Sequence, residues 1–155
     1  ADSTIQHVQR IATELRPASL DELGLLPTIR WFCREFEYLH PEIRIEQQIS
    51  LQEQEIPEPL RIVIYRIIEA VLKDIGEHPH KNRIRLSLQP TAKAIILAID
   101  DIPQDVASVV TASSWGTLPR LRFAAAQERA TLSGGAFSAA FNREGGITLH
   151  ASWAM

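Results

Sequence analysis

The sequence predicts an α/β two-layer sandwich, in which a mixed sheet carries its helices on one face. The clearest observation is the stretch 56–78, where apolar residues recur at the spacing of one helical stripe. Shorter stretches on both sides of it alternate apolar and polar residues, as half-buried strands do. The predicted order is two helices, a strand, the long helix, two strands, a helix and two strands. This order favours a single sheet with its helices packed against it.

Composition restricts the class of protein. The chain has 155 residues, a formal net charge of −3 and 45% apolar residues, which fits one globular domain with room for a short appendage. The negative charge gives no general attraction for nucleic acid or anionic lipid. A single cysteine, Cys33, excludes an internal disulfide and favours a reducing compartment. No apolar run approaches the ~20 residues that span a bilayer, and no signal-peptide pattern is present. Because Ala1 is not a methionine and a helix is already predicted over 5–15, we expect a fragment of a larger protein.

Two helices and a strand are predicted before the long helix. Apolar residues repeat at helical spacing over 5–15, and Arg16-Pro17 ends that helix because the residue before proline avoids the α region. Ser19 to Glu22 resembles a capping box leading into Leu23-Gly24-Leu25, and a second helix is predicted to follow over 26–38. Alternation over 43–49 predicts a half-buried strand.

Prolines and one glycine set the ends of the long helix. Pro57 and Pro59 suit its entry, where a missing N–H costs nothing. Gly76 would let the chain leave the helix. The face opposite the apolar stripe is charged, and its members are Arg61, Arg66, Glu69, Lys73, Asp74 and Glu77. We expect this charged face either to be solvated or to hold a ligand.

The second half of the chain predicts two hairpins with a helix between them. Strands are expected over 84–88, 94–99, 136–142 and 147–153. The segment 100–105 is expected to be a loop, and the Ser/Thr-rich segment 107–119 is interpreted as another. The helix is predicted over 121–132, where it would end at a pair of glycines.

Several motifs occur in an order that resembles one protein family. The motifs are Leu15-Arg16-Pro17 with Leu20-Asp21 and Leu23-Gly24-Leu25, then Tyr65-Arg66-Ile67, Glu128-Arg129-Ala130, Leu132 to Gly135 and Gly146 to Thr148. Together they resemble the bacterial sensor histidine kinases of two-component systems, in the subclass that includes nitrate sensors and the desaturase-regulating thermosensor. There the first group is the "LRPxxLDxLGL" junction between a dimerisation helix and the ATP-binding domain.

The resemblance implies an architecture and an activity. Residues 1–17 would be the end of a dimerisation helix with its junction, and residues 18–155 the histidine-kinase-type ATPase domain. In this family the domain binds Mg·ATP and transfers the γ-phosphoryl group to a histidine, which would lie upstream of Ala1. The implied partners are a response regulator and a second kinase protomer, with a homodimer formed by the longer protein. Contacts with nucleic acid or membrane are not expected.

The helix that would bind nucleotide departs from the family pattern. Alignment on Tyr65-Arg66-Ile67 places Ala70 at the family's acidic position, often given the general-base role. Asp74 falls on the magnesium-binding asparagine, Glu77 on a basic residue that faces the phosphates, and His78 on the family histidine. Asp74 could still offer an oxygen to Mg²⁺, whereas Ala70 has no titratable group. A register shifted by one residue breaks the agreement at both ends of the motif.

Two further nucleotide-binding motifs are altered. The family's "DxGxG" becomes Asp101-Ile-Pro103-Gln-Asp105, so the aspartate that receives the adenine amino group remains while both glycines are lost. The lid motif "GxGLxGM" corresponds to 120–126, where Arg120 and Arg122 could bind phosphate by charge but no glycine lets the backbone cradle it. We therefore expect a degenerate domain in which binding of ATP and Mg²⁺, and phosphoryl transfer, are weak or absent.

Simpler interpretations stand beside these. Asp101 could be a turn-former at a strand end, and both the charged helix face and the two lid arginines could be solvated. His78 and His80 are too few for a metal site. Cys33 is best interpreted as a small core residue.

Three functions stay open. The first is an active kinase domain with unusual motifs, marked by Mg·ADP binding that depends on Asp101. The second is a pseudokinase that pairs with a partner kinase or a response regulator whether or not nucleotide is present. The third is a related ATPase-fold switch protein such as an anti-sigma kinase. The junction at 15–25 argues against the third, because such stand-alone proteins have no dimerisation helix to join.

Overall fold

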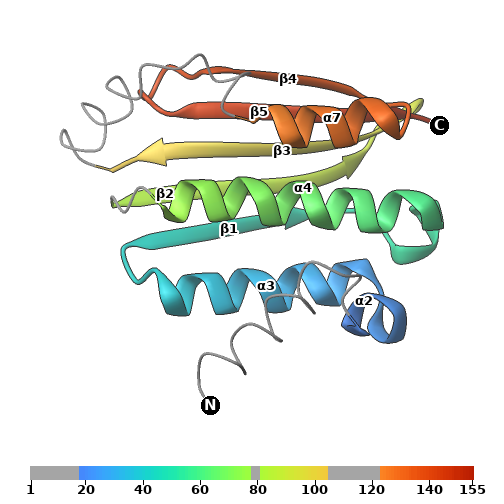
Figure 1. Cartoon of the computed structure of the whole chain (residues 1–155), viewed down its shortest axis with the longest axis horizontal. Coiled ribbons are helices and arrows are strands. Elements are labelled where there is room, and N and C mark those ends of the chain that lie inside the picture. The colour runs from blue at the N-terminus through green and yellow to red at the C-terminus, as the bar shows by residue number, and fades with distance from the viewer. Residues whose placement is uncertain (1–17, 78–80, 105–122) are drawn as a thin grey trace.

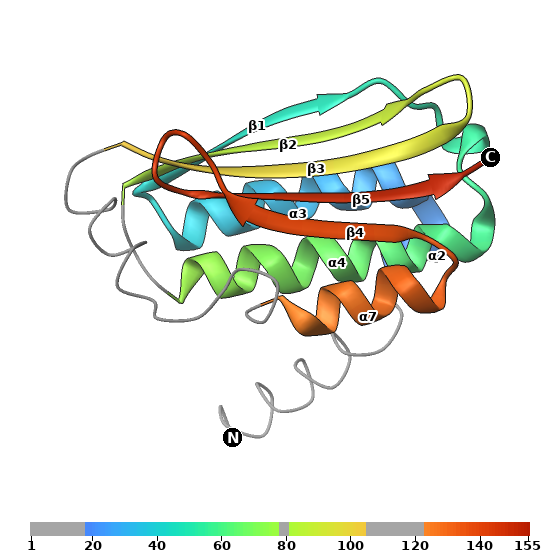
Figure 2. The ribbon, with the colours of Figure 1, turned by 90° about the horizontal axis from the view of Figure 1, so that it is seen from above.

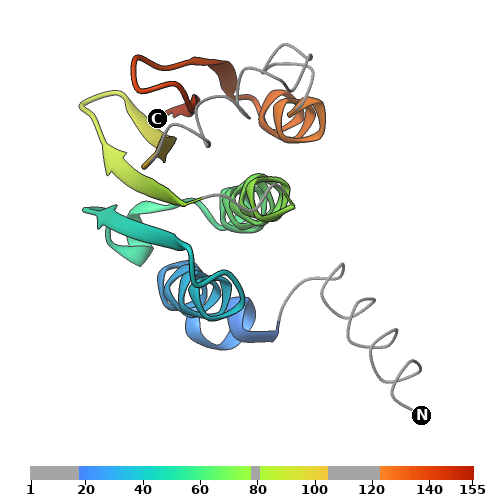
Figure 3. The ribbon, with the colours of Figure 1, turned by 90° about the vertical axis from the view of Figure 1, so that its left-hand side faces the viewer.

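The computed structural model describes residues 18–77, 81–104 and 123–155. These residues form two layers, a twisted five-stranded sheet and a set of helices on one of its faces (Figure 1, Figure 3). The helix predicted over 5–15 and the loop predicted over 107–119 lie outside the described residues. The predicted α/β sandwich is confirmed.

The sheet is mixed, with strand order β1-β2-β3-β5-β4. Its strands are β1 (Ile43–Ile49), β2 (Asn82–Pro90), β3 (Ala94–Pro103), β4 (Ala136–Phe141) and β5 (Ile147–Ala154). β1 and β2 are parallel and are joined through α4 (Glu58–Gly76), whereas all other neighbours are antiparallel. The strand alternation in the sequence therefore placed all five strands, although β3 extends further than expected.

Three helices cover one face of the sheet, as the view from above shows (Figure 2). They are α3 (Leu25–Leu39), α4 and α7 (Ala124–Leu132), and the short α2 (Ala18–Leu23) precedes α3. α4 packs against both α3 and α7, and its apolar stripe is fully buried at Ile64, Ile68 and Val71. The residues of β2 and β3 that share this core are Ile84, Leu86, Leu88, Ile95, Leu97 and Ile99. Within the described ranges, no helix has the length and apolar content needed to cross a bilayer.

The connection from α2 to α3 turns at Gly24, whose φ of 94° lies in the left-handed region that favours glycine. The first N–H groups of α3, from Leu25 and Leu26, donate to the carboxylate of Glu53 at 2.8 and 2.9 Å. Glu53 opens the short 3₁₀ turn η1 (Glu53–Glu55) after β1. The predicted capping box at 19–22 is wrong, because those residues lie inside α2. A distant carboxylate satisfies the helix N-terminus instead.

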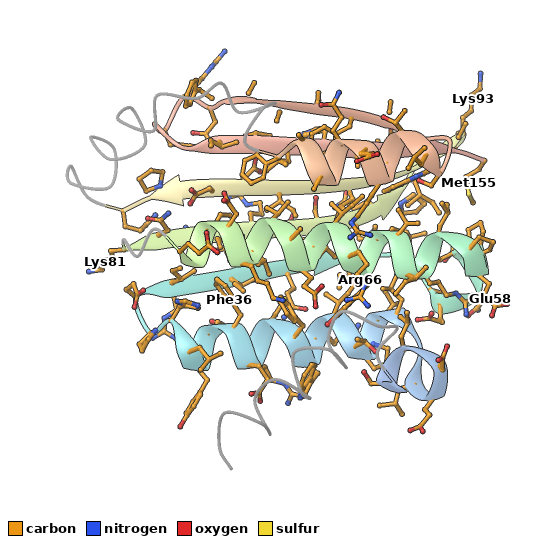
Figure 4. The ribbon with its side chains drawn as sticks, viewed as in Figure 1. Phe36, Glu58, Arg66, Lys81, Lys93 and Met155 are labelled. Atoms are coloured by element: carbon orange, nitrogen blue, oxygen red, sulfur yellow. The ribbon has the colours of Figure 1, made fainter. Side chains whose placement is uncertain are left out.

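Two charged residues of α4 are buried, so the charged face is not uniformly solvated. Arg66 and Glu69 are each 7% exposed, and Nη1 of Arg66 donates to Oε1 of Glu69 at 2.9 Å. Arg66 also lies 5.8 Å from the ring centroid of Tyr65, on the α3 side of α4 (Figure 4). The side chain of Lys73, in contrast, is 55% exposed. Packing of α4 between two other helices leaves only part of its polar surface in contact with water.

Candidate functional site

The two predicted site residues that the structure describes, Asp74 and Asp101, come from elements that meet at one end of the sandwich. The C-terminal end of α4, the last residues of β3 and the β4–β5 turn lie at the end marked by Lys81 (Figure 1, Figure 4). Asp74 belongs to α4 and Asp101 to β3. Three predicted contacts lie outside the described residues, and their roles stay predictions: His78, Arg120 and Arg122.

Asp101 is buried within β3 and does not lie in a loop. β3 continues to Pro103, and both Ile102 and Pro103 pair with residues of β2. Asp101 is 3% exposed and shares the helix-facing side of the strand with Ile99. The loop expected over 100–105 is therefore wrong for its first residues, and so is the turn-former interpretation of Asp101. Pairing with β2 continues past Ile99, so β3 extends to Pro103.

Two asparagines and a glycine contact Asp101. The carboxylate oxygen Oδ1 accepts a hydrogen bond from Nδ2 of Asn82 at 2.5 Å, and the backbone carbonyl accepts one from Nδ2 of Asn142 at 3.0 Å. A Cβ on Gly146 would overlap this same carbonyl oxygen. Asn142 also accepts the N–H of Gly146 at 2.9 Å, so one side chain fixes the β4–β5 turn against β3.

Asn82 is a site residue that the sequence analysis missed. It is the first residue of β2, is 6% exposed, and lies on the helix-facing side with Ile84 and Leu86. Its carbonyl oxygen Oδ1 is buried and receives no hydrogen bond within the part of the chain that the structure describes. A signal was present, because Asn82 extends the buried alternation of Ile84 and Leu86 by one step.

The α4 face that the resemblance assigns to phosphate binding carries little chemistry. Ala70, Asp74 and Glu77 stand four and three residues apart, so they share one side of the helix. Ala70 and Asp74 are half-buried and Glu77 is exposed. The neighbouring Glu69 does not replace the acid missing at Ala70, because its carboxylate is bound to Arg66.

This face offers one carboxylate, that of Asp74, to a magnesium ion. Among the residues with described positions, no group of three or more His, Cys, Asp or Glu side chains could hold a metal ion. Mg²⁺ requires octahedral oxygen coordination and is usually held by one or two carboxylates together with phosphate and water. Asp74 supplies one carboxylate beside a position, Ala70, that supplies none, so the described residues do not fit the ion well.

Two buried groups keep their protons to high pH. Burial, and to a lesser degree the charge of Glu37, raises the pKa of Cys33 to about 12. Burial and then the nearby charge of Glu69 raise the pKa of Tyr65 to about 12, while Arg66 acts in the opposite direction. A thiol that stays protonated is not a nucleophile. Cys33 is therefore a core residue, as predicted.

A groove of about 240 Å³ lies where β1 and β2 begin. Its lining residues are Pro41, Glu42, Arg44, Lys81, Asn82, Arg83 and Gln104. Three of these are cationic and one is anionic, so the groove is locally basic in a chain whose net charge is −3.

Comparison with curated proteins identifies relatives of this chain. It is 25% identical over 99 residues to the signal transduction histidine-protein kinase/phosphatase DegS of Brevibacillus brevis. It is 28% identical over 97 residues to the oxygen sensor histidine kinase NreB of Staphylococcus carnosus. The chain is a homologue of sensor histidine kinases. The matches cover 64% and 63% of this chain but only 25% and 28% of those kinases, so the chain corresponds to about a quarter of each.

Solved histidine-kinase structures share the fold. A blue-light activated histidine kinase of Erythrobacter litoralis EL346 matches 83% of this chain and 44% of its own, with a TM-score of 0.60 and 12% identity. The histidine kinase AdeS of Acinetobacter baumannii matches 99% and 81%, also with a TM-score of 0.60 and 12% identity. The catalytic domain of histidine kinase ThkA matches 81% and 92%, with a TM-score of 0.51 and 15% identity. No family model matches the chain. The fold of a histidine-kinase catalytic domain, expected from the motifs, is confirmed.

Proposed function

We propose that the chain is the ATP-binding-domain part of a two-component sensor histidine kinase in which magnesium-dependent ATP binding and phosphoryl transfer are lost or very weak. One observation carries this proposal: the side of α4 that would face the phosphates has alanine at the acidic position. Alanine cannot accept a proton. The adjacent carboxylate, that of Glu69, is 7% exposed and is bound to Arg66 at 2.9 Å.

Charge and backbone geometry support the same proposal. Phosphoryl transfer relies on positioning the phosphates and neutralising their charge. Asp74 and Glu77 add negative charge where the family has an asparagine and a basic residue. Pro103, at a family glycine position, is paired opposite Asn82 in the sheet and has no N–H to offer a phosphate. The complex of nucleotide with Mg²⁺ would therefore bind weakly to this face of α4.

A domain of this kind would act through contacts with other proteins. α3 exposes Trp31 and Tyr38, which stand two turns apart on one side of the helix and are 49% and 81% exposed. Exposed aromatic side chains are enriched at protein interfaces. A second kinase protomer and a response regulator are the proposed partners, with homodimerisation through dimerisation helices that include residues 1–17. The proposed location of this chain is the cytoplasm. The full-length protein could be attached to a membrane through another of its segments.

The experiment is a phosphorylation assay on the longer protein that contains both this chain and the dimerisation helices. The protein is incubated with Mg·ATP labelled on the γ-phosphate, with NreB as the positive control. The expected result is no labelled histidine, or labelling far slower than that of NreB. Labelling at a rate comparable with NreB would instead support the alternative function, an active kinase domain with unusual motifs.

A further inference from the structure

We propose that β4 is a pairing surface for a second copy of this chain, so that two β4 strands join antiparallel about Ala139 and the two sheets become one. Backbone hydrogen bonds and two aromatic pairs hold the copies together. The proposal goes beyond the proposed function, because it depends neither on nucleotide nor on the dimerisation helices.

β4 ends the sheet with an unprotected edge. In the described sheet it has one neighbouring strand, β5 (Figure 1). Its residues, Ala136 to Phe141, include no charged residue and no proline. Natural edge strands usually carry such residues, because they prevent another chain from pairing. β1, at the opposite edge, carries Arg44 and Glu46, and Glu46 lies 3.6 Å from Arg83 of β2. The protection found at one edge of the sheet is therefore missing from the other.

The turn of the β4–β5 hairpin determines which backbone groups of β4 point outward. The N–H of Asn142 donates to the carbonyl of Gly146 at 2.9 Å, so the backbone groups of Asn142 point toward β5. In an antiparallel ladder the backbone groups of successive residues point to alternate edges. The N–H and carbonyl groups of Phe137, Ala139 and Phe141 therefore point to the open edge.

The sequence of β4 matches itself when a second copy runs antiparallel. Pairing about Ala139 places this residue opposite its own copy, and Phe141 of each chain opposite Phe137 of the other. All three positions direct their backbone groups outward, so each pair exchanges hydrogen bonds. Phe137 and Ala139 pack against the core, so the paired side chains lie on the helix-facing side. Aromatic cross-strand pairs stabilise a sheet, and a shift of one residue would lose both these pairs and the hydrogen bonds.

Pairing also brings together two exposed apolar side chains. Phe141 is 53% exposed at the end of β4, and Leu132 is 80% exposed at the end of α7. Antiparallel pairing sets the end of one β4 beside the start of the other, and α7 ends shortly before that start (Figure 2). Phe141 of one copy and Leu132 of the other therefore lie at the same end of the joint. On the other face of the sheet β4 has only small side chains, those of Ala136, Ser138 and Ala140, so a second strand meets no obstacle there.

The test is a disulfide between two copies of the Ala139→Cys chain. Residues of a hydrogen-bonded antiparallel pair have Cα atoms about 5.5 Å apart, a distance that a disulfide spans. We expect oxidised glutathione to convert most of this variant into a covalent dimer, measured by gel electrophoresis without reductant. Cys33 is buried and does not compete.

Ala136→Cys is the matched control on the same strand. In the proposed register the two copies of residue 136 lie six residues apart, or about 20 Å, so their thiols cannot meet. This variant should give at least about fivefold less covalent dimer than Ala139→Cys, since a disulfide does not form across that distance. Position 136 is exposed and position 139 is half-buried, so accessibility alone predicts the opposite order.

A charge on the open edge should prevent pairing. Added to Ala139→Cys, Phe141→Lys places a cation opposite Phe137 of the second copy and should lower the yield of dimer at least about fivefold. Gln48→Lys places the same charge at an exposed position of β1 and should leave the yield unchanged. Circular dichroism establishes that each variant is folded. If Phe141→Lys is unfolded, Ala140→Lys, also at an exposed position, takes its place.

Two outcomes would overturn the pairing: equal yields from Ala139→Cys and Ala136→Cys, or a yield that the lysine in β4 does not lower. Association through residues 1–17 cannot imitate the expected result, because it sets no single residue of β4 opposite its own copy. None of these yields bears on phosphoryl transfer. Labelling of a histidine by Mg·ATP would overturn the proposed function and leave the pairing of β4 untouched.

Discussion

Gly146 lies against Asp101 so closely that a single added Cβ would overlap the Asp101 carbonyl oxygen. The contact joins the β4–β5 turn to β3 at the residue that the motif alignment predicts to receive an adenine amino group. The side chain of Asn142 bonds to the same carbonyl at 3.0 Å and to the N–H of Gly146 at 2.9 Å. The contacts of Asn142 and Gly146 therefore fix the position of the Asp101 backbone.

Gly146→Ala should destabilise the fold strongly, because the new methyl group must push the turn away from β3 and break the hydrogen bond from Asn142. We expect a loss of about 3 kcal/mol in the free energy of unfolding, measured in urea. Gly134→Ala is the matched control: its φ of 84° disfavours alanine, but no atom lies within 4 Å of the added Cβ. That variant should lose only about 1 kcal/mol. Equal losses in the two variants would contradict the close contact.

Glu53→Ala should destabilise the start of α3. The change removes the acceptor for the N–H groups of Leu25 and Leu26 and the partner of Arg61, whose Nε lies 3.3 Å from the carboxylate. The expected loss is about 1–2 kcal/mol in the free energy of unfolding. Glu35→Ala, at an exposed position of α3, should change stability by less than about 0.5 kcal/mol. If both variants unfold at the same urea concentration, Glu53 is not the cap.

Glu69→Gln should reveal whether the buried pair with Arg66 stabilises α4. Removing the charge leaves the Arg66 guanidinium 7% exposed without its carboxylate, and we expect a loss of about 3 kcal/mol. Lys73→Gln is the control, since Lys73 lies 3.9 Å from Glu69 with its side chain 55% exposed. That pair should contribute less than about 0.5 kcal/mol. A Glu69→Gln protein as stable as the parent would show that the charge of Glu69 makes no net contribution to the stability of the fold.

Stability should fall as the pH rises above 9. The ordinary pKa values of a cysteine thiol and a tyrosine hydroxyl are 9.0 and 10.0, and burial raises those of Cys33 and Tyr65 to about 12 in the fold. The unfolded chain therefore releases these protons first, so the stabilisation is complete below pH 9 and is lost between pH 9 and about 12. The measurement is urea unfolding from pH 8 to 11. Cys33→Ala should show a shallower decline than the parent chain, and an identical decline would exclude the thiol as a cause.

Local patterns predicted most of the fold. Alternation located all five strands, and helical spacing located α3 and α4 to within a few residues. The sequence predicted that β3 ends at residue 99, which is too early, because aspartate is disfavoured in strands. What keeps Asp101 in the strand is pairing with β2 and the side chain of Asn142, which is 41 residues away in sequence.

The site was less predictable because its contacts join distant segments. Glu53 caps a helix that starts 28 residues earlier, so no local capping motif could show it. Arg66 and Glu69 look like exposed charges until α3 and α7 pack around α4. Asn82 is an ordinary turn residue by composition, and only its place in the buried alternation of β2 gives it a role.

The most direct test of the central claim is calorimetric titration of the chain with ADP and ATP, each with and without Mg²⁺, repeated on Asp101→Asn. Circular dichroism would establish that both proteins are folded. The proposal of a degenerate domain predicts that Mg²⁺ does not strengthen the binding of either nucleotide. Magnesium-dependent heat that disappears in Asp101→Asn would contradict it, and would make the chain a working ATP-binding domain with unusual motifs.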